Sequence, residues 1–330
     1  MISDAPPPPP AIAPAADTPA VAAGQFVWRE ITTTGGTRRY RLYIPTGYDG
    51  TRPLPLVVML HGCTQDADNV ARGTRMNAAA DANKIVIAYP EQPASANALR
   101  CWNWFEPAHQ QRDLGEPASI AAVTRQVMHD VRIDPARIYI AGVSAGAAMA
   151  LTLMYSYPDL YAAVGVHSGI AYGFAGSMGE GVKSMGTGAA NPAMLGAAAR
   201  RAMGNRARPI AAIVFHGGTD AVVKAVNGTQ VVSQIQQANV HLSALYSGAT
   251  PQVTPVATRG ETSAGYHYSR ISYGSGMSAI EQWVVDELGH AWSGGSPDGT
   301  YTDAKGPDAT TEMIRFFLKQ PRPRARLNSR

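Results

Sequence analysis

The stretch that decides the fold is Arg137-Ile-Tyr-Ile-Ala-Gly-Val-Ser-Ala-Gly146, followed at once by Ala147-Ala-Met-Ala150. A β-branched apolar run leads into Gly-Val-Ser-Ala-Gly, and a run of small residues typical of a helix comes next. This order predicts a strand, a sharp turn and a helix, with Ser144 at the turn and with Gly142 and Gly146 allowing close strand–helix packing. Such a nucleophile elbow indicates acyl transfer.

Outward from the elbow, short continuous apolar runs alternate with helical patterns. The runs are typical of strands buried on both faces, and they lie at 56–60, 85–89, 138–140, 162–166 and 210–215. The helical patterns cover 70–83, 117–131, 145–157 and 228–239. The alternation predicts an α/β fold with a mostly parallel central sheet and helices on both faces. An antiparallel hairpin at 26–44 precedes it, and strands at 266–272 and 280–285 and a helix at 310–318 follow it.

The length of 330 residues fits a single catalytic domain, which we expect over residues 25–319. Residues 1–24 are rich in Pro and Ala and are predicted to be disordered, without the features of a signal peptide. Residues 320–330 form a basic tail whose four arginines account for the net charge of +4. We therefore expect no nucleic-acid partner. Since no run reaches the roughly 18 apolar residues that span a bilayer, we expect no membrane partner either.

A serine hydroxyl needs a general base and an acid that orients the base, and in α/β hydrolases these follow in the order Ser, Asp or Glu, His. Asp220 ends the motif His216-Gly-Gly-Thr-Asp220 after a predicted buried strand, and His290 lies in a Gly-rich loop after another strand. Asp286 is too close to the histidine in sequence to be the better acid. We predict a triad of Ser144, Asp220 and His290, with no cofactor, because no histidine pair has metal-ligand spacing.

The tetrahedral intermediate also needs two backbone N–H donors aimed at its oxyanion. Ala145 follows the nucleophile and supplies one donor, and the loop Leu60-His-Gly-Cys-Thr64 supplies the other through the amide of Cys63. We interpret His61 as a brace for this loop.

The chain has two cysteines, Cys63 and Cys101, each beside a segment predicted to reach the rim of the site. Two interpretations remain open: a disulfide that joins the two loops, or two buried reduced thiols. A disulfide would favour a secreted or periplasmic protein.

Five motifs together resemble the polyhydroxybutyrate depolymerase and feruloyl esterase family, over roughly residues 38–318. They are Leu60-His-Gly-Cys-Thr-Gln65, Cys101-Trp-Asn-Trp-Phe105, Gly142-Val-Ser-Ala-Gly146, His216-Gly-Gly-Thr-Asp220 and Gly289-His-Ala-Trp-Ser-Gly-Gly295. The resemblance implies the α/β-hydrolase fold, the same triad and a disulfide between the two cysteine loops. It also implies cleavage of ester bonds in hydroxyalkanoate polymers or oligomers, or in feruloyl and acetyl carbohydrates. Secreted polymer depolymerases of the family usually carry a separate binding domain, whereas this chain ends soon after the last predicted helix, which favours oligomers or smaller esters.

Three tryptophans, Trp102, Trp104 and Trp292, lie in loops predicted to flank the site. They form either an apolar cleft for the acyl group or packing contacts between the loops. The sequence does not separate these two roles.

Residues 168–209 fit no strand and are predicted to form a helical insertion over the active site. Arg200 and Arg201 lie in it, together with Arg206 and Arg208. Some proteins similar to this family hydrolyse poly(aspartic acid), and guanidinium groups over the site would bind such a polyanion. The alternative is a solvated basic face. A third class, a non-catalytic protein that binds polyester granules, fits less well because the chain keeps all three triad residues.

Overall fold

The computed structural model describes residues 24–33, 36–189, 194–247 and 254–322. Most of the predicted disordered segment 1–24 and of the predicted tail 320–330 lies outside these residues. The beginning of the tail contacts the fold, since the Arg322 amide donates to the carbonyl of Ala136 at 2.7 Å. Within the described residues, no helix is both long enough and apolar enough to cross a bilayer.

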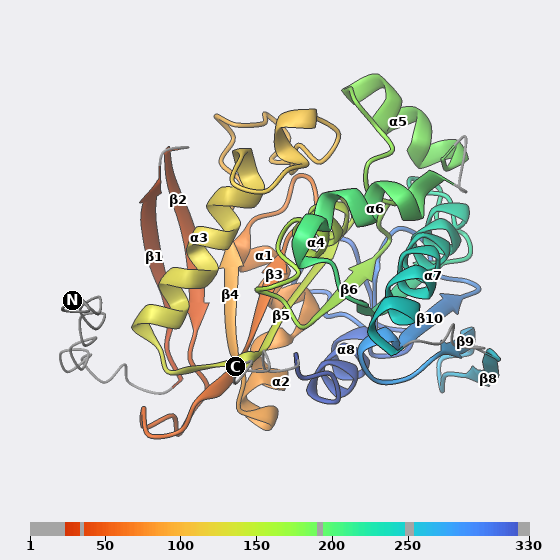
Figure 1. The fold of residues 1–330 in the computed structure, drawn as a ribbon. Helices are drawn as coiled ribbons and strands as arrows, with labels where there is room; N and C mark the ends of the chain where they lie inside the picture. The colour runs from red at the N-terminus through yellow and green to blue at the C-terminus, as the bar shows by residue number, and fades with distance from the viewer. Residues whose placement is uncertain (1–23, 34–35, 190–193, 248–253, 323–330) are drawn as a thin grey trace, which may run out of the picture.

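A ten-stranded sheet in the order β1-β2-β4-β3-β5-β6-β7-β10-β9-β8 forms the centre of the molecule (Figure 1). The strands from β4 to β10 in this order pair in parallel, and β1, β2, β9 and β8 pair antiparallel at the two edges. The strands are β1 (Phe26–Thr33), β2 (Gly36–Tyr43), β3 (Leu54–Leu60), β4 (Val86–Pro90), β5 (Ile133–Val143), β6 (Ala163–His167), β7 (Ala211–Gly217), β8 (Val256–Glu261), β9 (His267–Tyr273) and β10 (Ile280–Val285). The predicted mostly parallel sheet with an N-terminal antiparallel hairpin is confirmed.

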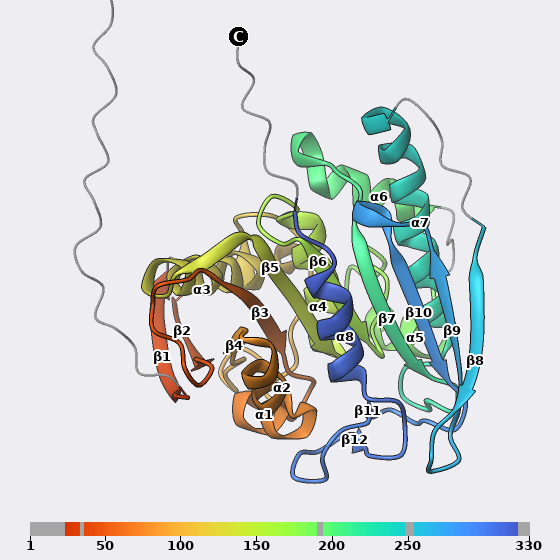
Figure 2. The same ribbon diagram turned by 90° about the horizontal axis from the view of Figure 1, so that it is seen from below.

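Helices cover both faces of the sheet, as Figures 1 and 2 show. One layer contains α3 (Gly115–Asp130), α4 (Ala145–Ser156), α6 (Leu195–Met203) and α7 (Val226–Ser247). The other contains α1 (Ala67–Thr74), α2 (Met76–Asn83) and α8 (Ala309–Leu318). Each layer packs on its own hydrophobic core, and every residue of α4 is buried. The smaller elements are α5 (Met178–Thr187), the 3₁₀ turns η1 (Pro107–His109), η3 (Gly204–Arg206) and η4 (Gly276–Ser278), and the paired strands β11 (Trp292–Ser293) and β12 (Thr302–Asp303).

Two local predictions were wrong. The helix expected over 70–83 is two helices, because Arg75 between them takes a left-handed conformation with φ of 55°. Its guanidinium donates hydrogen bonds to the carbonyl of Gly294 and to the Asp308 carboxylate. Local sequence does not reveal these contacts because both partners lie far away in the chain. The edge strand β8 was missed because its side chains are almost all exposed and therefore carry no apolar pattern.

A disulfide joins Cys63 and Cys101, which are 38 positions apart in sequence and have their Cα atoms 4.2 Å apart. The disulfide interpretation is therefore confirmed. It links the loop after β3 to the loop that precedes α3. A cross-link closing a loop of this size lowers the entropy of the unfolded chain and is worth up to about 4 kcal/mol of stability.

We expect the double variant Cys63→Ala, Cys101→Ala to lose up to about 4 kcal/mol in the free energy of unfolding, because its unfolded chain is no longer cross-linked. Urea denaturation followed by circular dichroism measures the change. Wild-type protein in dithiothreitol is the control and should fall to a similar value. An unfolding free energy equal to that of the oxidised wild type would contradict the prediction.

Candidate active site

Ser144 lies at the turn between β5 and α4 in a strained backbone conformation, with φ of 56° and ψ of −121°. Two glycines make the turn possible. A Cβ on Gly142 would lie 2.3 Å from the backbone of Gly146, and a Cβ on Gly146 would lie 2.4 Å from the carbonyl oxygens of Leu60 and His61. The elbow therefore depends on two backbone approaches that no larger residue permits.

The structure brings Ser144, His290 and Asp220 into one hydrogen-bonded chain. His290 Nδ1 lies 2.8 Å from Asp220 Oδ2, and His290 Nε2 lies 3.0 Å from Ser144 Oγ. Because a carboxylate only accepts, Nδ1 carries the proton and Nε2 is free to accept from the serine hydroxyl. This is the geometry that a general base needs.

The Asp220 side chain is fully buried, and its remaining oxygen accepts the amides of Val222 and Val223 at 2.9 and 2.8 Å. Burial by itself would raise the pKa of Asp220. The hydrogen bond and the electrostatic attraction of His290, together with the Val223 amide, outweigh burial, so the pKa of Asp220 lies below its usual value. The carboxylate is therefore ionised when it orients His290.

The loop of His290 is anchored to the core by the residues around it. Trp292 stacks on the buried His167, with ring centroids 4.9 Å apart, and its Nε1 donates to Thr310 Oγ1 at 3.1 Å. The Ser293 amide donates to His167 Nε2 at 3.0 Å. Burial lowers the pKa of His167 to about 3, so its ring stays neutral and can accept this bond.

Two backbone amides near Ser144, those of Cys63 and Ala145, were predicted to bind an oxyanion. A Cβ on Gly62 would lie 3.5 Å from Ser144 Cβ, so the loop carrying Cys63 runs next to the nucleophile. The Gly62 amide donates to Gln65 Oε1 at 2.9 Å. By contrast, the amides of Cys63 and Ala145 donate to no protein acceptor among the described residues. Both amides are therefore available as donors, and their role in binding an oxyanion stays a prediction.

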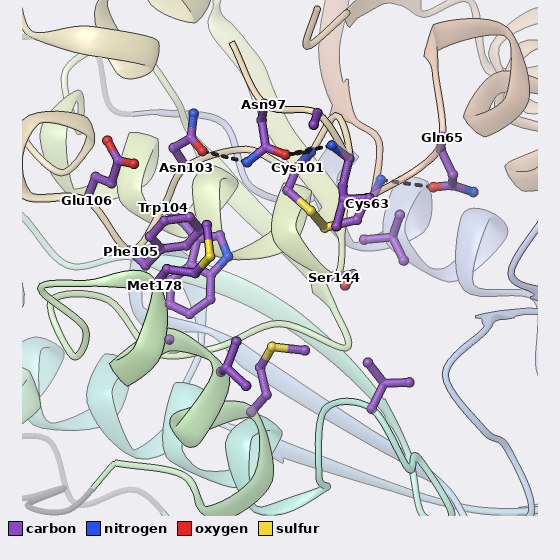
Figure 3. A pocket seen from close by; sticks show the side chains of 18 of the residues that line it. Cys63, Gln65, Asn97, Cys101, Asn103, Trp104, Phe105, Glu106, Ser144 and Met178 are labelled. Atoms are coloured by element: carbon purple, nitrogen blue, oxygen red, sulfur yellow. Dashed lines mark hydrogen bonds between the residues drawn. A yellow bond between two sulfur atoms is a disulfide. The ribbon is translucent and has the colours of Figure 1, made fainter. Parts of the chain in front are cut away.

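A cavity of about 720 Å³ opens above Ser144 and His290. Figure 3 shows the disulfide next to Ser144, with Trp104, Phe105 and Met178 together on the side away from Gln65. The apolar side chains come from three segments: Leu99, Trp104 and Phe105 from the loop before α3, Met178, Val182 and Met185 from α5, and Val222 from the Asp220 loop. Among the residues that the structure describes, no Lys or Arg lines the cavity. The insertion predicted at 168–209 therefore reaches the site through α5.

Of the three tryptophans predicted to bind substrate, only Trp104 lines the cavity. Trp102 is buried and its Nε1 donates to the carbonyl of His61 at 3.1 Å. Trp292 is also buried and stacks on His167. Trp102 and Trp292 therefore have the packing role that the sequence left open, and the assignment of these two to substrate binding is corrected. Their indole N–H groups donate to buried acceptors far away in sequence, the His61 carbonyl and Thr310 Oγ1, and sequence spacing does not show such contacts.

The predicted arginines also lie away from the cavity. Arg200 Nη1 donates to the carbonyl of Gln237 at 3.2 Å, and Arg201 lines a separate polar cavity with Arg112 and Tyr172. Arg208 is buried and donates to the carbonyl of Pro158 at 2.8 Å. The prediction that Arg200 and Arg201 stand over the active site is corrected, because α6 packs on α7 and only α5 reaches the triad.

Sequence reasoning missed the residues that α5 and the Tyr301 loop bring to the cavity. Tyr301 lies in a T-shaped contact with His290, with ring centroids 6.4 Å apart, and Met178 and Val182 are exposed at the mouth. The sequence signal that could have found them is the pair Met178 and Val182, which are four positions apart and therefore on one face of the Gly-rich helix α5. A helical face alone does not show what it covers.

Comparisons with known proteins agree with this geometry. The chain is 30% identical over 263 residues to poly(3-hydroxyalkanoate) depolymerase C of Paucimonas lemoignei, covering 78% of this chain and 59% of that protein. It is 34% identical over 137 residues to feruloyl esterase B of Thermothelomyces thermophilus, covering 41% of this chain and 45% of that protein. The chain thus spans about half the length of these relatives.

Among solved structures, the acetyl xylan esterase from Aspergillus awamori matches with a TM-score of 0.65 at 18% identity, over 80% of this chain and 94% of that chain. This similarity confirms the predicted α/β-hydrolase fold. The profile of the family described as esterase PHB depolymerase matches residues 38–254. The chain therefore belongs to the PHB depolymerase esterase family.

Proposed function

We propose that this protein is a serine esterase that cleaves the ester bonds of hydroxyalkanoate polymers or oligomers through an acyl-enzyme. The observation that carries the proposal is the chain of hydrogen bonds from Asp220 through His290 to Ser144 at the floor of an apolar cavity. Its family membership supports the same reaction type.

In the proposed mechanism, Ser144 Oγ attacks the ester carbonyl while its proton passes to His290 Nε2. The amides of Cys63 and Ala145 hold the negative oxygen of the tetrahedral intermediate. The carbon–oxygen bond to the leaving alcohol then breaks, and His290 gives its proton to that oxygen. Water repeats the sequence on the acyl-enzyme, with His290 as the base, and releases the acid and free Ser144. Asp220 stays ionised and stabilises the imidazolium.

The cavity supports a neutral substrate over a polyanion. Its walls are mostly apolar, and within the described part of the chain they include the carboxylate of Glu106 but no Lys or Arg side chain. A chain of aspartates would leave its charges without partners there, at a large desolvation cost. The arginines that motivated poly(aspartic acid) lie elsewhere, so hydroxyalkanoate esters are the better substrate class. Feruloyl esters are a second candidate because Trp104 and Phe105 place an aromatic edge-to-face pair on the cavity wall.

Half of the ten large apolar side chains that are exposed in the described residues lie around this one cavity: Leu99, Met178, Val182, Val222 and Tyr301. Such a concentration of exposed apolar groups is typical of a binding surface. It suits a long aliphatic ester that extends past the cavity mouth. The disulfide supports an oxidising location, and we propose that the protein is secreted or periplasmic.

We expect Ser144→Ala to lower kcat for p-nitrophenyl butyrate by about 10⁴-fold or more, because the nucleophile is gone and only binding and oxyanion stabilisation remain. Steady-state hydrolysis measures the loss. The thermal unfolding midpoint should stay near that of wild type, and a fluorophosphonate should label the wild type and not the variant. Turnover at the wild-type rate would refute the proposed nucleophile.

We expect Val182→Asp to lower kcat/KM for p-nitrophenyl octanoate about tenfold, because contact with a valine side chain is worth about 1.5 kcal/mol. Hydrolysis of p-nitrophenyl acetate, whose acyl group is too short to reach the rim, should change little. Val256→Asp is the matched control, since both valines are 63% exposed and Val256 lies on β8 outside the cavity. Equal effects of the two substitutions on the octanoate ester would argue against an acyl-binding rim.

We expect the wild type to release acid from hydroxybutyrate oligomers. The rate should change little between about 0.05 and 0.5 M salt, because binding of a neutral ester does not depend on charge interactions that salt screens. Poly(aspartic acid) should give no product. Chromatography of the products after incubation with each polymer makes the comparison. Cleavage of poly(aspartic acid) that weakens steeply with salt would instead support the polyanion alternative.

A further inference from the structure

Glu116 is a buried carboxylate outside the triad, at the start of α3, with 2% of its surface exposed. Three N–H donors converge on it. Asn103 donates through its backbone amide and through Nδ2, both at 2.8 Å, and Gln92 donates through Nε2. Glu116 does not line the active-site cavity, whereas Asn103 does. A buried carboxylate with three donors in one loop fixes the position of that loop.

The loop held by Glu116 is the cavity wall that carries Cys101. Asn103 Oδ1 accepts from Asn97 Nδ2 at 2.8 Å, and Asn97 Oδ1 accepts the amides of Leu99 and Cys101 at 3.0 and 3.3 Å. Figure 3 shows this row of side chains leading from Asn103 to the disulfide. A displacement of Asn103 would therefore be transmitted to Cys101 and, through the disulfide, to Cys63.

Gln92 forms a second connection from Glu116 to the oxyanion loop. Its Nε2 also donates to the carbonyl of Cys101 at 3.0 Å, and its backbone amide donates to His61 Nε2 at 3.0 Å. Burial lowers the pKa of His61 to about 4, so the ring is neutral and its Nδ1 donates to the carbonyl of Gly62 at 2.8 Å. This bond fixes the peptide whose N–H belongs to Cys63.

The network also balances charge inside the protein. Arg38 is buried and its Nη1 donates to Gln92 Oε1 at 2.7 Å, so Gln92 bridges a guanidinium and the Glu116 carboxylate. Burial lowers the pKa of Arg38, and the charge of Glu116 opposes that shift. The side-chain amide of Gln92 connects the positive charge of Arg38 to the negative charge of Glu116. Removing the carboxylate would leave the buried guanidinium without a compensating charge, which is costly.

The two loops need such support because their backbones are strained. Thr64 and Arg100 have φ of 62° and 51°, a region that residues with side chains seldom occupy. The loops meet where the Thr64 amide donates to the carbonyl of Leu99 at 2.6 Å. Strained turns keep one conformation only where the surrounding contacts over-determine it.

We propose that Glu116 is a positioning residue for the oxyanion hole: through Asn103, Gln92 and Cys101 it holds the Cys63 amide where the developing negative oxygen forms. This inference rests on the proposed esterase function. Glu116 touches neither substrate nor Ser144 and acts through the two loops.

The variant Glu116→Gln tests the proposal, because it keeps the shape of the side chain and places an NH₂ group among three donors. We expect kcat for p-nitrophenyl butyrate to fall about 10- to 100-fold, the loss that follows displacement of a catalytic group by about 1 Å. KM should change little, since the cavity side chains remain. The inhibition constant of phenylboronic acid should rise by the same factor as kcat falls, because its tetrahedral adduct with Ser144 uses the same amides.

Ser119→Ala is the matched control. Ser119 is also buried on α3, but its Oγ donates only to the carbonyl of Gly115 and reaches neither loop. This variant should keep the wild-type kcat and boronate affinity. Folding of each variant is checked by circular dichroism and thermal unfolding.

A folded Glu116→Gln variant with kcat and boronate affinity within threefold of wild type would overturn the proposal, as would equal losses in Ser119→Ala. If Glu116→Gln does not fold, the variant Asn103→Ala is used, which removes the hydrogen bond from Asn103 Nδ2 to Glu116. Its kcat and boronate affinity should fall together. Unchanged kcat and boronate affinity in this variant would also overturn the proposal. Failure of the proposed function has a different signature, because the wild type itself would then neither hydrolyse the ester nor bind the boronate.

Discussion

The close approach of three backbone segments around Ser144 is the constraint on which the rest of this structure depends. The segments β3, β5 and α4 meet at Gly142 and Gly146, where a single Cβ would overlap backbone atoms at 2.3 to 2.4 Å. Only this approach allows a side-chain-bearing residue to sit at φ of 56° with its hydroxyl above the carboxyl edge of the sheet. The strain is held by the surrounding core, since α4 is buried along its whole length.

The parallel sheet then turns a set of separate loops into one site. Ser144, Asp220 and His290 follow β5, β7 and β10, and the oxyanion loop follows β3. Neighbouring parallel strands end at the same edge, so residues 70 and 146 positions apart in sequence come within hydrogen-bond distance. The hydrogen-bonded chain from Asp220 through His290 to Ser144 is therefore a consequence of strand order. Contacts of Trp292 and Gln65 and the disulfide hold the loops around it.

Buried polar groups also hold the loops of Cys63 and Cys101. Glu116, Gln92 and His61 are all buried and each is hydrogen-bonded to the loop of Cys63 or of Cys101. Buried polar groups are costly when unpaired, so the hydrogen bonds of these three side chains favour one loop conformation. The apolar residues of α5 line the cavity above Ser144, into which we propose that the acyl group of the substrate enters.

The sequence by itself determined the elbow and the mostly parallel sheet, because both are encoded by local apolar runs, glycines and turn residues. It also predicted that Ser144, Asp220 and His290 act together and that the amides of Cys63 and Ala145 bind the oxyanion. Only the tertiary structure decided whether a given tryptophan faced the cavity, because Trp102 and Trp292 are distinguished from Trp104 by long-range hydrogen bonds and stacking. It also decided that α5, and not the arginines of α6, reaches the site. The helix break at Arg75 and the role of Glu116 depend on partners far away in the chain, and periodicity carries no information about them.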